Sequence, residues 1–362
     1  MPRGRLGMNN LDLSFYRGKT VLITGHTGFK GSWMCRILTL AGAKVIGYSL
    51  NPPTNPNLFE TLGLESEITS IIGDIRDYKK LKDVIDKHRP EIVFHLAAQP
   101  IVRLSYEEPL YTYEVNVIGT ANLLEVIRHS NSVKSVVNVT TDKVYLNNDI
   151  PNHAFTEDEP LDGFDPYSNS KSCSELVTHS YKKSFFDPIK LSVSTCRAGN
   201  VIGGGDFAKD RIIPDAIRAI EDGKPLFVRN PNSTRPYQHV LEPLYIYLTI
   251  AKAQYEDFSY AGYYNVGPDN CDCVTTGELI RLFDELYGPE ATWEVGDPNG
   301  PHEANFLKLD ASRLKKAFGW QPRTHIKEAL QLVVDWTKVY LTHSQEAINE
   351  ETNREIFKFF RL

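Results

Sequence analysis

The feature that most constrains this chain is a short apolar run that leads directly into a glycine-rich loop. The run Val21-Leu22-Ile23-Thr24 has the length of a strand, glycines follow at positions 25, 28 and 31, and a helical stretch comes next. Glycines in such a turn let the backbone approach a pyrophosphate closely, while the first helical turn offers free N–H groups and the positive end of its dipole. The same glycines would also suit a purely structural turn. The predicted dinucleotide loop comprises Gly25, Thr27, Gly28, Phe29, Lys30 and Gly31.

Apolar runs of strand length alternate with amphipathic stretches through the first half of the chain. Strands are predicted at residues 20–24, 44–49, 68–72, 91–96, 135–140 and 191–197. Helices are predicted between them at residues 31–41, 78–88, 109–129 and 167–184. This alternation is typical of a buried parallel sheet with helices on both faces. The predicted fold class is therefore α/β, a Rossmann-type doubly wound parallel sheet with a smaller C-terminal α+β substrate domain.

The regularity weakens after residue 200. Helices are predicted at residues 212–221, 276–287 and 311–318, and a short strand at residues 225–228. A chain of 362 residues is long enough for two packed units. We therefore expect residues 8–200 to bind the dinucleotide, with part of the later chain returning to them, and residues 201–362 mainly to bind a nucleotide sugar.

Composition and charge exclude several classes of function. The formal net charge is −6 and the basic residues are scattered, so the sequence predicts no nucleic-acid partner. No apolar stretch approaches the ~18 residues of a membrane span, and no apolar block follows the N-terminal arginines as in a secretory signal. Residues 1–7 precede a second methionine and are left out of the fold prediction.

The five cysteines indicate a reducing compartment. Their number is odd and their spacing shows no paired framework, which favours a cytoplasmic protein. Cys271 and Cys273 stand close together, but a structural zinc normally needs four soft ligands and the sequence offers no second pair. The sequence therefore predicts no metal site.

The end of the second predicted strand bears on the choice of dinucleotide. An acidic residue there would bind the ribose hydroxyls of NAD, and an arginine would favour the 2′-phosphate of NADP. The strand ends Gly47-Tyr48-Ser49-Leu50-Asn51, which has neither, and the absence of a nearby cation favours NAD. Asp74, after the third strand, could accept a hydrogen bond from the adenine amino group. The predicted cofactor site also includes Ile75, Ala97, Ala98, Gln99, Asn116 and Arg197.

A tyrosine and a lysine four residues apart are the first candidates for chemistry. Tyr167 and Lys171 would lie one above the other on a helix face. A nearby ammonium favours the phenolate, which predicts a lowered pKa for Tyr167. Tyr167 could then take the proton of a sugar hydroxyl as its hydride leaves, while Lys171 holds the nicotinamide ribose. Such pairs also arise by chance on solvated helices, and the upstream dinucleotide loop is what makes this one informative.

Polar residues follow the fifth predicted strand, at the edge where parallel sheets bind ligands. They are Thr141, Asp142 and Lys143. Five other segments carry recognisable motifs: Gly25-His26-Thr27-Gly28-Phe29-Lys30-Gly31, His95-Leu96-Ala97-Ala98-Gln99-Pro100, Asp165-Pro166-Tyr167-Ser168-Asn169-Ser170-Lys171, Gly203-Gly204-Gly205-Asp206 and Arg235-Pro236-Tyr237-Gln238-His239. With these motifs the chain resembles the extended short-chain dehydrogenase/reductases, and most closely the CDP-glucose 4,6-dehydratases. The resemblance runs over nearly the whole chain from about residue 8.

The resemblance implies an internal redox dehydration. Hydride would pass from C4 of the glucose to NAD, with Tyr167 as base and Thr141 hydrogen-bonding the C4 oxygen. The new ketone acidifies the C5 hydrogen, so that water can leave across C5 and C6 with Asp142 protonating the departing hydroxyl. Return of the hydride to C6 would leave a 4-keto-6-deoxy sugar and no net NADH.

Two roles are open for Lys143. Dehydratases of dTDP-sugars carry glutamate at the corresponding position as the C5 base, and an ammonium cannot accept a proton. Burial or a neighbouring cation could make the neutral amine available. Alternatively, charged Lys143 stabilises the enolate while another group or water is the base.

Arginines in the second half are candidates for the substrate diphosphate, because a guanidinium offers several planar donors. The family match favours Arg235 first and Arg211 second. Arg229 could bind the substrate or could equally form a surface salt bridge. His302 could contact the nucleotide or could equally have a structural role. Tyr145 and Tyr237 could stack on a ring or simply pack. The full predicted substrate set is Arg103, Asn200, Arg211, Arg229, Arg235, Tyr237 and His302.

Two histidines near the cofactor loop, His26 and His95, are expected to pack and hydrogen-bond locally rather than to act in catalysis. A 4-epimerase or a dehydratase of another nucleotide sugar is the alternative among enzymes, and a dinucleotide-binding regulator is the alternative of a different class. The helices predicted at residues 109–129 and 167–184 are expected to pair with their copies in a homodimer or a dimer of dimers.

Overall fold

A seven-stranded parallel sheet forms the centre of the molecule in the computed structural model, which describes residues 11–296 and 306–361. The strand order is β11-β6-β5-β4-β1-β2-β3, and every neighbouring pair is parallel. The strands are β1 (Thr20–Thr24), β2 (Lys44–Ser49), β3 (Thr69–Ile72), β4 (Ile92–His95), β5 (Ser135–Thr141), β6 (Ser192–Ala198) and β11 (Tyr263–Val266). The predicted α/β fold class and its doubly wound sheet are confirmed.

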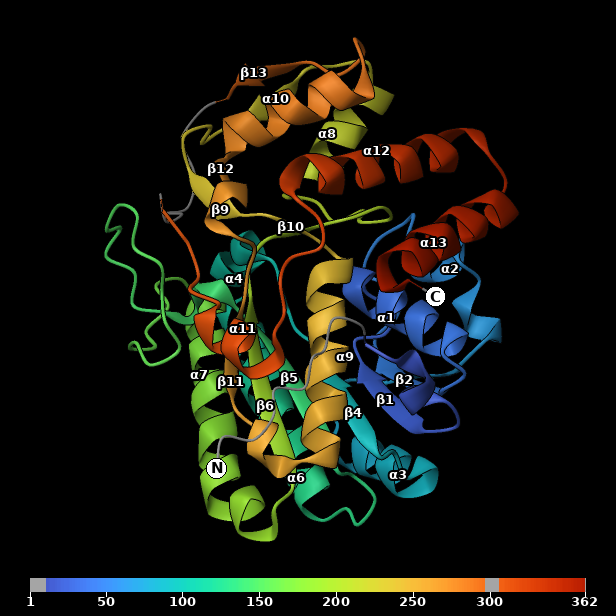
Figure 1. Cartoon of the computed structure of the whole chain (residues 1–362), viewed down its shortest axis with the longest axis vertical. Coiled ribbons are helices and arrows are strands. Elements are labelled where there is room, and N and C mark those ends of the chain that lie inside the picture. The colour runs from blue at the N-terminus through green and yellow to red at the C-terminus, as the bar shows by residue number, and fades with distance from the viewer. Residues whose placement is uncertain (1–10, 297–305, 362) are drawn as a thin grey trace.

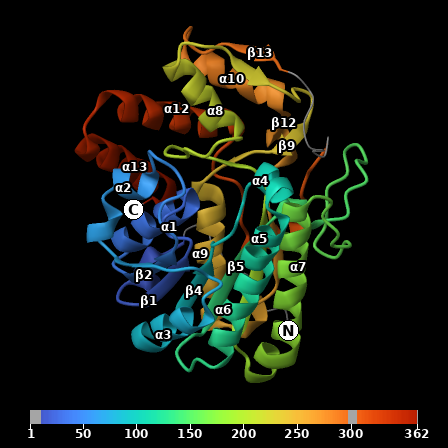
Figure 2. The ribbon, with the colours of Figure 1, turned by 180° about the vertical axis from the view of Figure 1, so that it is seen from behind.

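Helices cover both faces of this sheet (Figures 1 and 2). One face carries α1 and α9, and the other carries α3, α5, α6 and α7. The bounds of the helices around the sheet are α1 (Phe29–Leu40), α2 (Leu58–Thr61), α3 (Tyr78–His88), α4 (Val102–Glu107), α5 (Pro109–Tyr113), α6 (Gly119–Arg128), α7 (Pro166–Tyr181), α9 (Leu241–Glu256), α11 (Ser312–Phe318) and α13 (Gln345–Phe360). Two turns are π-helical, η3 (Glu114–Ile118) and η5 (Lys182–Phe186).

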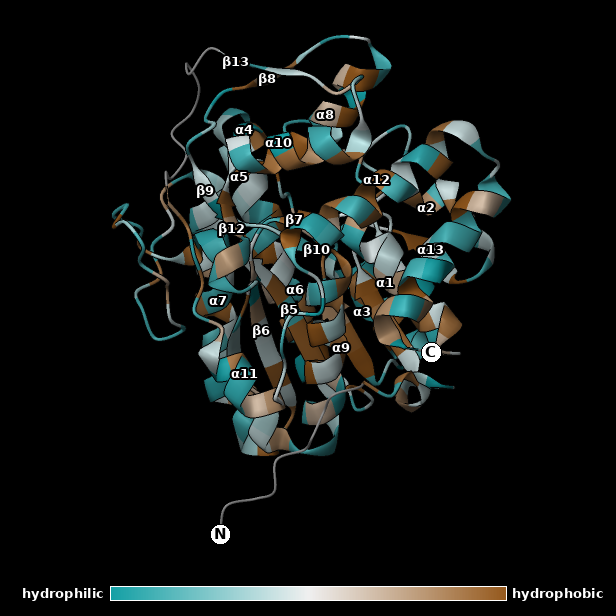
Figure 3. Ribbon diagram, turned by 45° about the horizontal axis from the view of Figure 1, so that its top comes forward, coloured by the Kyte–Doolittle hydropathy of each residue, from teal (hydrophilic) through white to brown (hydrophobic). Residues whose placement is uncertain are grey.

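The strands are apolar on both faces because each face has its own core. Along β1, Val21 and Ile23 belong to the core beneath α1 and α9, whereas Leu22 belongs to the core beneath α3 and α6. Side chains of a strand alternate between faces, so a strand buried on both must be apolar at every position. Figure 3 shows the hydrophobic residues concentrated in the strands and in the helices against them.

A smaller unit stands at the carboxyl ends of the strands. Its elements are β7 (Val201–Ile202), α8 (Ile212–Glu221), β8 (Leu226–Val228), β9 (Thr234–Pro236), β10 (Gln238–His239), β12 (Cys273–Thr275), α10 (Thr276–Tyr287), β13 (Trp293–Val295) and α12 (Ile326–Thr342). Three two-stranded sheets pair β10 with β7, β12 with β9, and β13 with β8. Its own hydrophobic core joins α8, α10 and α12. This unit lies above the sheet in Figure 1.

Two elements of the later chain were not predicted and lie in the main layers. Strand β11 pairs with β6, and helix α9 packs against β5 and β6. Helix α9 is buried around most of its circumference, so its sequence lacks the amphipathic period by which a surface helix is recognised. The sequence prediction also assigned nothing after residue 318, where α12 and α13 are well formed. In the described ranges, the helices are all too short or too polar to cross a membrane.

Candidate active site

A large cleft runs along the carboxyl ends of β1, β4 and β5 and beneath the smaller unit. Its volume is about 1240 Å³, and its walls include the glycine loop, the end of β5, the start of α7 and residues of β8 and β9. The order of the sheet reverses between β1 and β4, which is the place where open parallel sheets bind ligands. The cleft therefore brings the predicted cofactor and catalytic segments together.

The glycine loop has the tight geometry that its sequence predicts. Gly25 has a φ of +78°, and a Cβ on it would lie 2.7 Å from the backbone nitrogen of Ala97. A Cβ on Gly31 would lie 2.1 Å from the carbonyl oxygen of Gly25. These two positions therefore exclude any side chain, because the neighbouring groups are backbone.

Gly28 has a different reason to be glycine. A Cβ there would meet only the carbonyl oxygen of Gly25, at an ordinary 3.5 Å, so the protein itself leaves room. Gly28 is the N-cap of α1 and supplies no side-chain cap, and it lines the cleft beside Thr27 and Phe29. Uncapped N–H groups at a helix N-terminus bind phosphate. The loop thus fits the pyrophosphate of a dinucleotide, and a side chain at Gly28 would occupy the space that the pyrophosphate needs.

Asp74, on the wall of the cleft, belongs to an ion pair that the sequence prediction missed. Arg76 donates through Nη2 to Asp74 at 2.7 Å and through Nη1 to Glu114 at 2.6 Å. The hydrogen bonds from Arg76 hold the pKa of Asp74 below its usual range. These two carboxylates compensate the Arg76 guanidinium, so it does not alter the preference for NAD. Asp74 and Ile75 line the cleft.

The loop after β4 is held by an amide network. Ala97, Ala98 and Gln99 line the cleft. The side chain of Gln99 is occupied within the loop, because it donates to Thr112 at 2.9 Å and accepts from the Ile101 N–H at 2.6 Å.

Asn116 lies behind this loop and is not a cleft residue. Its amide donates to the Gln99 carbonyl at 3.1 Å and to Ser170 at 2.9 Å, and its oxygen accepts from the Gln99 N–H at 2.9 Å. Its predicted contact with the cofactor is corrected to a positioning role, in which it ties the loop to α7.

Arg197 is also misplaced by the sequence prediction. Its guanidinium lies inside the protein, 2.9 Å from the Glu175 carboxylate and 2.9 Å from the Tyr145 hydroxyl, and it does not line the cleft. Side chains alternate along a strand, so a residue near the ligand edge of β6 can face the buried side instead. Tyr145 packs in the same cluster, stacked on Phe155.

The end of β5 delivers the predicted catalytic groups into the cleft. Asp142 is buried, accepts from the Thr141 hydroxyl at 3.0 Å through Oδ1, and keeps its Oδ2 without a partner among the described residues. Burial raises the pKa of Asp142 above its usual value, although Lys143 and Thr141 oppose the effect. A carboxyl group with a raised pKa can hold a proton near neutrality and donate it.

Tyr167 lies beside Thr141 at the start of α7. Asp165 caps this helix by accepting from the Ser168 N–H at 2.9 Å, which fixes the first turn that carries the tyrosine. Burial raises the pKa of Tyr167 to about 12, while the hydrogen bond with Thr141 and the charge of Arg211 act in the opposite direction. The predicted lowering by Lys171 is therefore not observed, because desolvation of the phenolate outweighs it.

Two lysines, Lys171 and Lys30, line the cleft. Lys171 donates to the Val139 carbonyl at 3.1 Å, and burial lowers its pKa to about 8. Lys30, from the glycine loop, also has its pKa lowered to about 8 by burial, assisted by the charges of Arg211 and Lys171. Lys143 lines the cleft next to Asp142, within the turn η4 (Asp142–Val144).

The predicted substrate arginines line the cleft from two sides: Arg211, Arg229 and Arg235 from the smaller unit, and Arg103 from α4. Arg211 pairs with Asp206 at 2.9 Å, and Arg103 pairs with Asp210 at 3.1 Å. Arg235, on β9, is buried and close enough for its charge to act on Asp142. Asp206 was not predicted as a site residue, although an acid directly after Gly203-Gly204-Gly205 was a visible signal.

The remaining predicted substrate residues are distributed as follows. Asn200 and Arg229 line the cleft. Tyr237 also lines it, with its hydroxyl 3.2 Å from that of Thr276. His302 lies outside the described residues.

The two histidines near the loop are packing residues, as predicted. His26 contacts Ser70 through Nε2 at 2.8 Å and packs edge-on against Phe59. His95 lies between Thr24 and Thr120, at 2.7 Å and 3.1 Å. Burial lowers the pKa of His26 to about 4 and that of His95 to about 3, so both are neutral near pH 7.

Comparisons with known proteins agree with this geometry. The family model described as GDP-mannose 4,6 dehydratase matches residues 22–333. The CDP-glucose 4,6-dehydratase of Salmonella typhimurium is 47% identical over 337 residues, which are 91% of this chain and 94% of that protein. The dTDP-glucose 4,6-dehydratase of Haemophilus influenzae is 26% identical, over 90% of this chain and 99% of its own.

Solved structures share the fold. The dTDP-glucose 4,6-dehydratase of Bacillus anthracis in complex with NAD has a TM-score of 0.74 at 23% identity, covering 89% of this chain and 97% of its own. The UDP-glucose 4-epimerase of Thermus thermophilus in complex with NAD has a TM-score of 0.74 at 25% identity, covering 88% of this chain and 99% of its own.

Proposed function

Because the chain belongs to the GDP-mannose 4,6 dehydratase family, within the extended short-chain dehydrogenase/reductases, we propose that it dehydrates CDP-glucose with NAD as its cofactor. The product is CDP-4-keto-6-deoxyglucose, and the enzyme is a hydro-lyase. The nucleotide is assigned from the Salmonella relative, which shares 47% identity over nearly its full length. The nucleotide sugar is thus the small-molecule partner of the cleft.

The environment of the Asp142 carboxyl is the observation that best supports a dehydration. Epimerisation at C4 needs a base and a hydride acceptor, whereas loss of the C6 hydroxyl also needs an acid. Asp142 is placed to supply it, because the residue lines the cleft, burial raises the pKa of its carboxyl, and the buried Oδ2 has no hydrogen-bond partner in the described part of the chain. Among the enzymatic alternatives, this favours a 4,6-dehydratase over a 4-epimerase.

The residues of the chain perform four tasks in the reaction. When bound, NAD takes a hydride from C4 and returns it to C6. Tyr167 accepts the proton of the C4 hydroxyl while Thr141 hydrogen-bonds the same oxygen. Asp142 then protonates the leaving C6 hydroxyl, and water departs. Lys171 anchors the nicotinamide ribose from a position fixed by the Val139 carbonyl.

Lys143 stands where the C5 proton must be handled. We propose that it either accepts this proton as a neutral amine or, when charged, stabilises the enolate that forms. Wash-in of solvent deuterium at C5 separates the roles. Lys143→Ala abolishes the exchange if the amine is the base. Exchange at the normal rate in this variant would exclude that role.

The smaller unit is proposed to hold the nucleotide part of the substrate. Arg235, on β9, and Arg211, at the N-terminus of α8, are proposed to bind the diphosphate, since both line the cleft. Arg211 must exchange part of its contact with Asp206 for a phosphate oxygen. Asn200, Arg229 and Tyr237 complete the cleft wall on this side.

The activity is tested by incubating the protein with NAD and CDP-, dTDP-, UDP- and GDP-glucose in parallel. CDP-glucose is expected to yield a 4-keto product that has lost one water, without net NADH. A C4 diastereomer of unchanged mass would show an epimerase, and preferred turnover of another nucleotide would correct the base. Absence of any reduction of bound NAD by all four sugars would indicate a regulator instead.

The variant Asp142→Asn tests whether this carboxyl acts in the dehydration step. Asp142→Asn is expected to lower dehydration about 10²–10⁴-fold, the usual contribution of a positioned acid. It should still reduce bound NAD in a single turnover, because removal of hydride from C4 does not use this carboxyl. Equal loss of both steps would show that Asp142 acts earlier than proposed.

A homodimer is proposed through α5, η3, α6 and α7. These elements lie side by side on one face of the molecule (Figure 2) and expose large apolar side chains. Leu110 is 73% exposed, Ile118 53% and Leu176 54%. Apolar groups gathered in this way mark association surfaces. A cytoplasmic location is proposed as well, since the five cysteines are all free thiols.

A further inference from the structure

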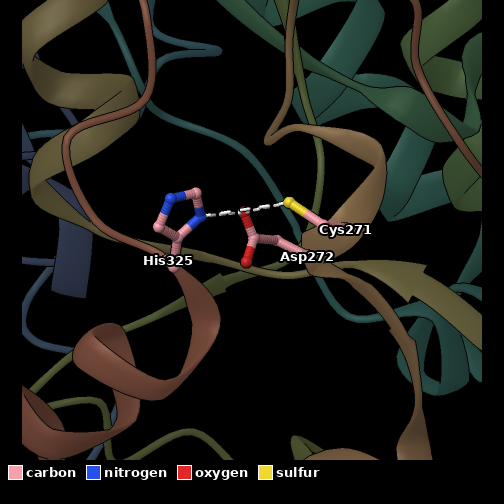
Figure 4. A group of neighbouring side chains, drawn as sticks. All are labelled: Cys271, Asp272 and His325. Atoms are coloured by element: carbon pink, nitrogen blue, oxygen red, sulfur yellow. Dashed lines mark hydrogen bonds and ion pairs between the residues drawn. The ribbon is translucent and has the colours of Figure 1, made fainter.

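A second group of reactive side chains lies away from the cleft, where helix α12 begins. Cys271 and Asp272 belong to the turn η8 (Asn270–Asp272), and His325 is the N-cap of α12. Cys271 and His325 are 54 residues apart in the sequence. Figure 4 shows the thiol, the carboxylate and the imidazole directed toward one another.

The separations of the three ligand atoms fit one face of a tetrahedron. Sγ of Cys271 lies 3.6 Å from Oδ2 of Asp272 and 4.0 Å from Nδ1 of His325, and that nitrogen lies 3.0 Å from Oδ2. A tetrahedral Zn²⁺, with bonds of about 2.0–2.3 Å to nitrogen, oxygen and sulfur, holds such atoms about 3.3–3.6 Å apart. Side-chain adjustments of a few tenths of an ångström would bring all three into range.

The surroundings favour a cation. The side chain of Asp272 is only 4% exposed, and its charge acts on both partners. The hydrogen bond and charge of Asp272, with smaller contributions from Glu328 and Asp269, raise the pKa of His325. Burial and the charge of Asp272 raise the pKa of the Cys271 thiol. The largely buried carboxylate thus places negative charge at the point where the thiol and the imidazole meet.

Asp272 can bind a cation without giving up its structural task. Its Oδ1 accepts from the backbone N–H of Ile326 at 2.9 Å and so stabilises the start of α12. Oδ2 is the atom that faces Cys271 and His325. One oxygen of Asp272 thus stabilises the helix, and the other is available to bind a cation.

We propose that Cys271, Asp272 and His325 form a binding site for one divalent cation of the zinc class, with a fourth position open to water or another ligand. Sulfur and imidazole donors select Zn²⁺ over Mg²⁺ or Ca²⁺, which prefer oxygen alone. The set was not visible in the sequence because Cys271 lacks a second cysteine pair and its partner histidine is distant.

The site connects to the substrate side of the cleft. Residue Cys273 follows the cluster directly and begins β12, in which Val274 pairs with Arg235 of β9. A cation that ties η8 to α12 would therefore steady the strand behind this arginine. The site adds a structural cation to the proposed enzyme and takes no part in hydride transfer.

The test uses the full chain, reduced and freed of metal, titrated with Zn²⁺ and with Co²⁺ as a spectroscopic probe. One ion per chain is expected, with the thiolate-to-cobalt charge-transfer band and intense visible bands of tetrahedral Co²⁺. Cys271→Ser and His325→Asn should each weaken binding by more than about 100-fold, since even outer partners of metal sites contribute about 10–100-fold. Asn is a favoured N-cap, so the second variant keeps the start of α12.

Cys173→Ser, in α7, is the matched control and should retain full affinity. Zn²⁺ should also raise the Tm of the wild-type protein and of this control, but not of the two ligand variants. A wild-type Kd weaker than about 10 µM, near −7 kcal/mol, would overturn the site. Affinity unchanged in either ligand variant would overturn it equally.

Discussion

At the scale of single residues, burial decides the chemistry of the cleft more than charge pairing does. Desolvation raises the pKa of both Tyr167 and Asp142, and it lowers the pKa of Lys171 for the same reason. The raised pKa favours the protonated form of the carboxyl, and the phenol needs help to ionise. Thr141 and Arg211 provide that help, since both lower the pKa of the phenol.

The alkaline limb of the pH–rate profile is expected to report Lys171. Burial lowers its pKa from 10.5 to about 8, so the ammonium is lost as the pH rises through about 8 and kcat/KM should fall there. Lys30 has a similar pKa of about 8. The limb should therefore persist in Lys30→Met and disappear from the residual activity of Lys171→Met. The reverse result would assign it to Lys30.

Arg197 provides a second test at this scale. Arg197→Met leaves the Glu175 carboxylate buried without its cation and should lower the free energy of unfolding by about 3–5 kcal/mol. The Kd of the folded protein for NAD should be unchanged, because the guanidinium does not reach the cleft. The double variant with Glu175→Gln should recover much of the stability. Weakened NAD binding with normal stability would restore the original assignment.

At the scale of elements, the glycines at the junction of β1 and α1 are required for different reasons. Gly25 and Gly31 are required by the packing of backbone on backbone, whereas Gly28 leaves space toward the cleft. The helix begins there without a side-chain cap. One short loop thus combines a structural requirement with an anion site.

Alanine substitutions separate these requirements. Gly28→Ala should change the free energy of unfolding by less than about 1 kcal/mol. It should weaken NAD binding at least about tenfold, or about 1.4 kcal/mol. Gly31→Ala should instead destabilise the protein by about 1–3 kcal/mol or more, because its Cβ would clash with backbone. Thermal unfolding and NAD titration of both variants distinguish the cases. Equal effects of the two would contradict the division.

At the scale of the whole molecule, the cleft exists because the chain crosses between two units. Helix α9 and strand β11 return to the main layers after the chain has built part of the smaller unit. Arg235 and Arg211 are therefore held on one side and Asp142 and Tyr167 on the other. Neither unit contains the complete candidate site.

The proposed dimer is a prediction at this scale. Leu176→Glu places a charge on the exposed face of α7 and should convert the dimer to a monomer in light scattering after gel filtration. Leu341→Glu, at an exposed position near the end of α12, is the control and should remain dimeric. A wild-type monomer, or a Leu176→Glu dimer, would contradict the proposed interface.

The sequence by itself determined the features that are local. The strands of the first half, the glycine loop, and the spacing of Tyr167 and Lys171 follow from periodicity and turn chemistry within one element, and the structure agrees with them to within a few residues. Helix α9 escaped prediction because burial on all sides removes the amphipathic signal.

The tertiary structure alone decided which groups face the cleft and which charges neighbour one another. Asn116 and Arg197 turned out to serve the interior, Arg76 to lie beside Asp74, and His325 to meet Cys271. These contacts join residues from different elements, and no local pattern encodes them. The pKa of Tyr167 likewise depends on desolvation by the assembled fold, which the spacing to Lys171 could not reveal.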